Sequence, residues 1–109
     1  MAAYIISDVT IKEGTAIETY RQRAAASIAQ HGGRYVVRGG EIEVLEGSWR
    51  PRAVIIAEFP DMDRARAWYR SAEYASALAL RDQALSRNLI LVDGVAVQEG
   101  AGRARTGSE

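Results

Sequence analysis

The chain has 109 residues, enough for one domain, and its 14 Lys and Arg balance its 14 Asp and Glu to a formal net charge of +0. A neutral chain has no overall field to attract it to nucleic acid or to an anionic membrane. The absence of cysteine excludes disulfides, thiolate nucleophiles and zinc–cysteine sites. No apolar run approaches the roughly 20 residues that span a bilayer, and the first residues lack a secretion signal, so we expect a cytoplasmic protein.

The first segments predict a strand followed by a helix. Residues 3–11 are rich in β-branched and aromatic residues, which is typical of a strand. Thr15 and Glu18 form a capping-box pattern, in which each side chain bonds a free backbone N–H at a helix start. Gly32 is suited to end this helix, because glycine tolerates positive φ. The helix carries an apolar stripe at spacings of three and four: Ile17, Tyr20, Ala24 and Ile28.

The middle of the chain predicts three strand-like runs. Residues 34–38 and 41–46 form two of them, and Gly39 and Gly40 separate these two as a turn or a bulge. Residues 52–59 form the third, which is almost continuously apolar between its ends.

The last part predicts two helices, a strand and a tail. Asp61 and Ser71 are suited to cap the helices. The apolar residues expected on them are Ala65, Trp68 and Tyr69, then Tyr74, Leu78 and Leu85. Residues 89–92 read as the final strand, and residues 98–109 are polar and without periodicity, which predicts a disordered tail. Residues 1–97 are therefore expected to be the single domain.

With residues 34–38 and 41–46 counted as one interrupted strand, this order predicts a ferredoxin-like β-α-β-β-α-β sandwich of the α+β class, with all helices on one face of the sheet. The strands are nevertheless apolar on both faces: Val54 and Ile56 point away from Ile55, and Ile90 and Val92 also share one face. An apolar second face needs a cover, and the chain has no spare element for it. We therefore expect a homodimer packed sheet against sheet.

Short motifs occur along most of the chain, from about Tyr4 to Gly94. They are His31-Gly32-Gly33-Arg34, Arg38-Gly39-Gly40, Leu45-Glu46-Gly47-x-Trp49-x-Pro51, Glu58-Phe59-Pro60, Ala67-Trp68-Tyr69-x-Ser71-x-Glu73-Tyr74, Arg81 and Val92-Asp93-Gly94. The series resembles a bacterial domain-of-unknown-function family, number thirteen-thirty, in the dimeric α/β-barrel superfamily. The resemblance implies a ferredoxin-like protomer whose sheet forms a barrel with its dimer mate. The family has no established activity, and its superfamily spans cofactor-independent monooxygenases, isomerases, haem-degrading enzymes and non-catalytic stress proteins.

Two residues are candidates for proton transfer. His31 is the only side chain with an ordinary pKa near neutrality, so it can serve as a general acid or base. It can equally interact with the free carbonyls at a helix end. Glu46 precedes Gly47 and Trp49, where a carboxylate in a dry cleft could move protons. The alternative for Glu46 is a turn or interface carboxylate paired with an arginine.

Six further residues are candidates for ligand binding. The planar guanidinium group of an arginine can bind an anionic substrate through two parallel hydrogen bonds, although most arginines are solvated or in ion pairs. A tryptophan in a loop can form the wall of a pocket or contact a second subunit. Two residues on one face of the first strand could line a barrel. These candidates are Arg38, Arg52, Arg81, Trp49, Tyr4 and Asp8.

Metal and cofactor chemistry is not expected. One histidine and no cysteine cannot form a three-histidine zinc site or a two-histidine iron site within a chain. The glycine pairs lack the spacing and the lysine of phosphate-binding loops. A haem ligated by His31 would rest on that residue alone. RNA-recognition domains share this strand order, but residues 52–59 offer only Phe59 for base stacking, so we expect no RNA partner.

Two functions from different classes fit these residues. The first is a cofactor-independent oxygenase or isomerase acting on a small aromatic or carbonyl-containing acid, with His31 or Glu46 moving a proton and an arginine binding the anion. The second is a non-catalytic dimeric binding or stress-associated protein, in which the same residues form a pocket or a subunit interface. The sequence favours a small-molecule site over a purely structural role.

Overall fold

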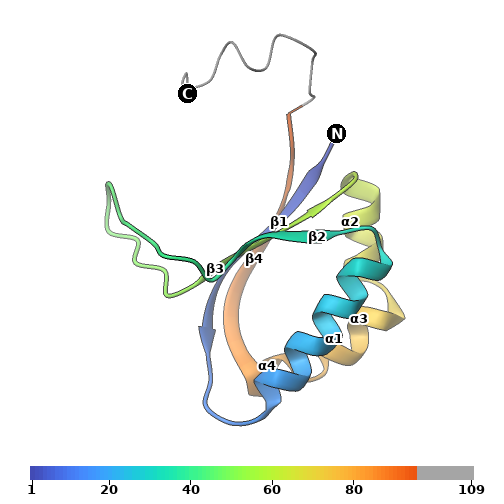
Figure 1. The fold of residues 1–109 in the computed structure, drawn as a ribbon, viewed down its shortest axis with the longest axis horizontal. Helices are drawn as coiled ribbons and strands as arrows, with labels where there is room; N and C mark the ends of the chain where they lie inside the picture. The colour runs from blue at the N-terminus through green and yellow to red at the C-terminus, as the bar shows by residue number, and fades with distance from the viewer. Residues whose placement is uncertain (96–109) are drawn as a thin grey trace.

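Four antiparallel strands form a single sheet in the computed structural model, which describes residues 1–95 (Figure 1). The strands are β1 (Ala3–Ile11), β2 (Arg34–Arg38), β3 (Val54–Phe59) and β4 (Leu85–Asp93). They lie in the order β2-β3-β1-β4. The first strand of the chain, β1, is therefore inside the sheet, and the last strand, β4, pairs with it and forms one edge. All three pairings are antiparallel, as a ferredoxin-like sheet requires.

All helices lie on the same side of this sheet (Figure 1). They are α1 (Ala16–Gln30), α2 (Met62–Tyr69), α3 (Ala72–Leu78) and α4 (Arg81–Ala84). The predicted one-sided α+β arrangement is therefore confirmed, with the second helical segment divided into three short helices. No helix among residues 1–95 combines the length and the apolar character that crossing a membrane demands.

Two of the three predicted helix caps are confirmed. Asp61 Oδ1 accepts a 2.7 Å hydrogen bond from the backbone N–H of Arg64, and Ser71 caps α3 in the same way. Thr15 makes no side-chain capping bond, so that part of the prediction is wrong. Its backbone is helical (φ −99°, ψ −9°), whereas a capping side chain needs an extended backbone. Gly32 ends α1 as predicted, with φ +79°.

The prediction of a strand over residues 41–46 is wrong. Residues 40–53, called the arm below, leave the sheet between β2 and β3 as an extended loop (Figure 1). The alternation of Glu41 and Glu43 with Ile42 and Val44 has the period of a strand, but no neighbouring strand in the protomer pairs with it. The alternation of polar and apolar residues therefore belongs to an extended segment that forms no backbone hydrogen-bond ladder with a strand of the sheet.

The final strand is longer than predicted, and it begins at Leu85, which the sequence placed on a helix. Pairing explains the difference, because β4 follows β1 along its whole length, from Ala3 opposite Asp93 to Ile11 opposite Leu85. The partner strand, and not the local pattern of β4, sets where β4 starts.

The core lies between the helices and one face of the sheet. The odd-numbered residues of β1 face the helices, and those from Ala3 to Val9 are buried, whereas its even-numbered residues lie on the other face. Trp68 of α2 and Tyr74 of α3 fill the centre, with 2% and 0% of their surfaces exposed. Gly33 lets the chain pass close to this core, because a Cβ there would lie 2.7 Å from the ring of Phe59.

The second face of the sheet, called the open face below, is uncovered among residues 1–95. Ile90 and Val92 of β4 expose 56% and 40% of their surfaces there, and Val37 of β2 exposes 38%. Ile6 and Ile56 pair across the same face. The prediction that these strands are apolar on both faces is confirmed. The predicted tail, residues 98–109, lies outside the described residues.

Candidate functional site

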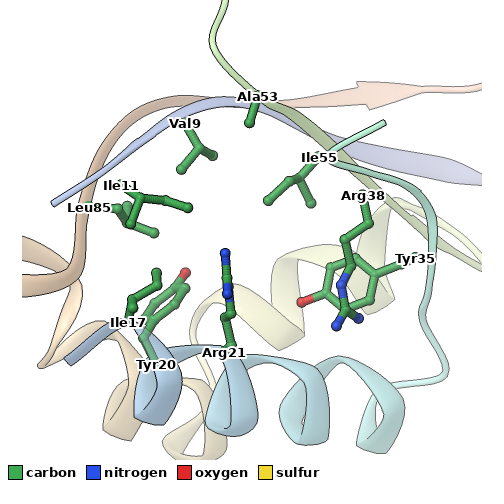
Figure 2. Close-up of a pocket in the computed structure, with 11 residues that line it drawn as sticks. Val9, Ile11, Ile17, Tyr20, Arg21, Tyr35, Arg38, Ala53, Ile55 and Leu85 are labelled. Atoms are coloured by element: carbon green, nitrogen blue, oxygen red, sulfur yellow. The ribbon is translucent and has the colours of Figure 1, made fainter. Parts of the chain in front are cut away.

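A cavity of about 310 Å³ lies between α1 and the covered face of the sheet (Figure 2). We call it the α1 cavity. One part of its lining is apolar and comes from β1, the start of β3, the start of β4 and α1. These apolar residues are Val9, Ile11, Ile17, Ala53, Ile55 and Leu85. A hollow of this size with an apolar lining suits a small organic molecule.

The polar part of the lining comes from two elements (Figure 2). Tyr20 and Arg21 extend from α1, and Tyr35 and Arg38 extend from β2. The Arg38 guanidinium lies 4.6 Å from the centre of the Tyr35 ring, which is within the range of a cation–π contact. The cavity therefore presents two phenols and two guanidinium groups to whatever occupies it.

A smaller cavity of about 50 Å³, called the inner cavity below, lies next to the α1 cavity. The two share five lining residues, Tyr20 and Tyr35 among them. Trp68 and Arg87 line the inner cavity but not the α1 cavity, and Arg87 also lines two hollows on the surface. The Trp68 indole N–H donates to Ser27 Oγ over 2.9 Å, so the only polar atom of this large side chain is satisfied.

Three polar side chains from different elements meet at the inner cavity. Arg87 of β4 donates to Tyr20 Oη over 2.7 Å and to Tyr74 Oη over 2.6 Å. The two phenolic oxygens are 2.8 Å apart. Among residues 1–95, Arg87 forms no ion pair with a carboxylate. Its hydrogen-bond partners among these residues are therefore the two neutral phenols.

Both tyrosines of the cavity are held in their protonated form. Burial raises the pKa of Tyr20, and the positive charge of Arg87 only partly opposes this. Burial likewise raises the pKa of Tyr35, with Arg38 acting in the opposite direction. At neutral pH these phenols are hydrogen-bond donors and not bases.

Of the predicted site residues, only Arg38 lines the α1 cavity. Asp8, Trp49 and Arg52 come together elsewhere, around a surface hollow of about 430 Å³ at the base of the arm. Trp49 Nε1 donates to Asp8 Oδ2 over 3.3 Å. A hydrogen bond from the Asn88 backbone N–H lowers the pKa of Asp8, so this group remains a carboxylate.

The remaining predicted residues are dispersed. His31 follows α1, with Nε2 3.4 Å from Glu73 Oε1. Glu46 is exposed in the arm. Arg81 contacts its neighbour Asp82, and Tyr4 donates to Glu58 on the open face over 3.2 Å. Within residues 1–95, no three side chains of His, Asp or Glu converge into a metal-binding group.

Sequence reasoning missed four polar residues that line the α1 cavity or the inner cavity: Tyr20, Arg21, Tyr35 and Arg87. Tyr20 was placed on the apolar stripe of its helix, where its ring does belong. A signal existed for Arg87: it stands between Leu85 and Leu89 on the covered side of β4, where an apolar residue is expected. A charged residue in a core-facing register is a reason to look for a polar site.

The comparisons with known proteins agree with this fold. The family model described as Domain of unknown function (DUF1330) matches residues 2–95, and a comparison with curated proteins finds no match. Among solved structures, the protein of unknown function RPA0582 from Rhodopseudomonas palustris is similar with a TM-score of 0.69 and 21% identity, over 88% of this chain and 84% of that one. SnoaB from Streptomyces nogalater, a cofactor-independent oxygenase, has a TM-score of 0.62 and 17% identity, over 92% and 97% of the two chains.

A dimeric protein of unknown function from Bacteroides fragilis, with a ferredoxin-like fold, has a TM-score of 0.50 and 10% identity, over 85% of this chain and 96% of that one. At such identities the likeness shows the fold alone. It confirms the predicted ferredoxin-like α+β class.

Proposed function

The chain belongs to the DUF1330 family, a domain of unknown function, and from its own side chains we propose that it binds a small aromatic or carbonyl-containing acid in the α1 cavity. The observation that carries the proposal is the lining of this cavity. Apolar residues of the sheet face two tyrosines and two arginines across about 310 Å³. An aromatic ring suits the apolar part, and an anionic group suits the guanidinium groups.

The charge of the lining supports an anionic ligand. Among residues 1–95, neither the α1 cavity nor the inner cavity is lined by Asp or Glu, whereas Arg21, Arg38 and Arg87 all line one of the two. A neutral protein has concentrated positive side chains here without matching carboxylates in the lining. Arginine is the side chain best suited to bind a carboxylate or an enolate in such a site.

Isothermal titration calorimetry with 2-naphthoate tests the proposal. We expect the wild-type protein to bind this aromatic acid, and Ala53→Phe to weaken binding by about tenfold or more, because the added ring fills the cavity. Ala75→Phe, on the exposed side of α3, is the matched control and should bind as the wild type does. Equal affinity in both variants would overturn the assignment of this cavity.

A binding protein without turnover is the second candidate. It is favoured by the composition of the lining, because the residues of 1–95 that line the two cavities include no His, Asp or Glu to accept a proton. SnoaB shares the fold and is a cofactor-independent oxygenase, which supports proposing oxygenase chemistry as the enzymatic alternative. General acid–base roles for His31 and Glu46 stay predictions of that alternative. Loss of ligand turnover in His31→Ala, with 2-naphthoate binding unchanged, would support it.

We also propose that two copies pack through their open faces. The exposed Ile90 and Val92 form part of a continuous apolar surface with Ile6 and Ile56, and a second copy brings the same surface to cover it. The dimeric protein from Bacteroides fragilis supports this choice of partner. The arm exposes 83% of Leu45 and 63% of Trp49, which such a partner could also cover.

A further inference from the structure

The three polar groups at the inner cavity contain one hydrogen-bond donor too many for the acceptors around them. Two phenols carry two hydroxyl hydrogens. The short contact between Tyr20 Oη and Tyr74 Oη, 2.8 Å, uses one of them. Arg87 donates to both oxygens and accepts nothing. Among residues 1–95, neither phenolic oxygen has another partner, so one hydroxyl hydrogen has no acceptor.

The position of the two phenols decides which hydroxyl that is. Tyr74 has no exposed surface and lines neither cavity, whereas Tyr20 lines both. If Tyr20 donated to Tyr74, the free hydrogen would belong to Tyr74 and would be enclosed in the core. The arrangement without a buried unsatisfied donor has Tyr74 donating to Tyr20, and Tyr20 donating into the cavity.

The charges around the inner cavity favour an anionic ligand. Arg87 donates a hydrogen bond to each phenolic oxygen and has no carboxylate partner among the described residues. Because burial raises the pKa of Tyr20, this phenol keeps its hydrogen and cannot itself neutralise the guanidinium. A hydrogen bond donated by Arg87 to Tyr20 Oη also makes the Tyr20 O–H a stronger donor. The missing acceptor is therefore best supplied by a negatively charged oxygen.

We propose that the inner cavity is an oxyanion site, where Tyr20 donates to a phenolate, enolate or carboxylate oxygen of the ligand and Arg87 stabilises the negative charge. This inference rests on the proposed function and adds which atom of the ligand points inward. The volumes agree with it: about 50 Å³ accommodates a charged oxygen group, while the ring of the ligand occupies the outer 310 Å³.

The test compares two probes of similar shape, 4-nitrophenolate and 4-nitroanisole, of which only the first carries an anionic oxygen. We expect the full chain to bind the phenolate about tenfold more tightly than the methyl ether, as a hydrogen bond to a charged group provides. Tyr20→Phe keeps the ring and removes the donor, and it should bring the affinity ratio close to one. Arg87→Met should do the same. Arg23→Met, on the exposed side of α1 and outside the lining of both cavities, is the matched control and should leave the ratio unchanged.

The outcomes separate this inference from the proposed function. If both probes bind equally to the wild type, or if Tyr20→Phe keeps the preference for the phenolate, the oxyanion site is overturned while the cavity remains a binding site. If Ala53→Phe fails to weaken the binding of either probe, the α1 cavity is not where they bind, and both proposals fall. Because Tyr20→Phe retains the aromatic ring in the core, the test does not depend on the folding of the Arg87 variant.

Discussion

Arg87 shows how a single side chain can join the core to a functional site. It lies on the covered face of β4, where Leu85 and Leu89 are buried or half-buried. Its two hydrogen bonds to Tyr20 and Tyr74 give this half-buried cation partners that are not carboxylates. Such an arrangement costs stability that an apolar side chain would not, which is a reason to expect a function for it.

The buried phenols predict how stability depends on alkaline pH. Burial raises the pKa values of Tyr20 and Tyr35 above the ordinary tyrosine value near 10, so the folded chain keeps protons that the unfolded chain releases. Their contribution to the free energy of unfolding is complete below about pH 10 and is lost as the pH rises further. Urea unfolding between about pH 8 and about pH 11 should show this decline.

Tyr20→Phe is the matched variant for this prediction, because it removes one titrating group and retains the ring. Its free energy of unfolding should fall less steeply with alkaline pH than that of the wild type. Identical slopes in the two proteins would show that Tyr20 titrates as it does in the unfolded chain.

At the scale of elements, two of the three local capping patterns predicted the structure, and the one at Thr15 did not. The caps at Asp61 and Ser71 act within three residues of chain, and both exist. The segment 41–46 had the alternation of a strand but lacks a pairing partner within the protomer. Strand pairing is a contact between distant residues, so the alternation alone could not establish it.

The two kinds of cap give a direct comparison. Asp61→Ala removes the 2.7 Å bond to the Arg64 backbone N–H and should lower the free energy of unfolding by about 1 kcal/mol. Thr15→Ala removes no capping bond and should change it by less than about 0.5 kcal/mol. Urea unfolding of both variants measures the difference. A loss at Thr15 as large as that at Asp61 would indicate that the predicted capping box forms in solution.

At the scale of the whole molecule, the sheet has one face covered by helices and one apolar face open. A monomer would leave Ile90, Val92 and Val37 in water, together with the apolar residues of the arm. Burial of apolar surface stabilises by roughly 25 cal/mol per Å², so two open faces together have a substantial driving force to associate. The proposed dimer would bury the apolar surface of both open faces.

Ile90→Glu tests the dimer, because it places a charge on the exposed apolar surface of the open face. We expect the wild-type protein to sediment as a dimer in analytical ultracentrifugation and this variant to sediment as a monomer, since burying an unpaired carboxylate is costly. Ala26→Glu adds the same charge on the exposed side of α1 and should remain dimeric. A monomeric wild type would refute packing through the open face.

The sequence by itself determined the class of fold, the order of its strands and helices, and the apolar character of both sheet faces. Those features follow from periods of 2 and 3.6 residues and from caps that act over one helical turn, all of which are local. Only the tertiary structure decided the site. Tyr20 lies 54 residues from Tyr74 and 67 from Arg87, and their oxygens and nitrogens meet because α1, α3 and β4 pack on one another. Hydrogen bonds across such separations depend on how whole elements are placed, which no local pattern in the chain specifies.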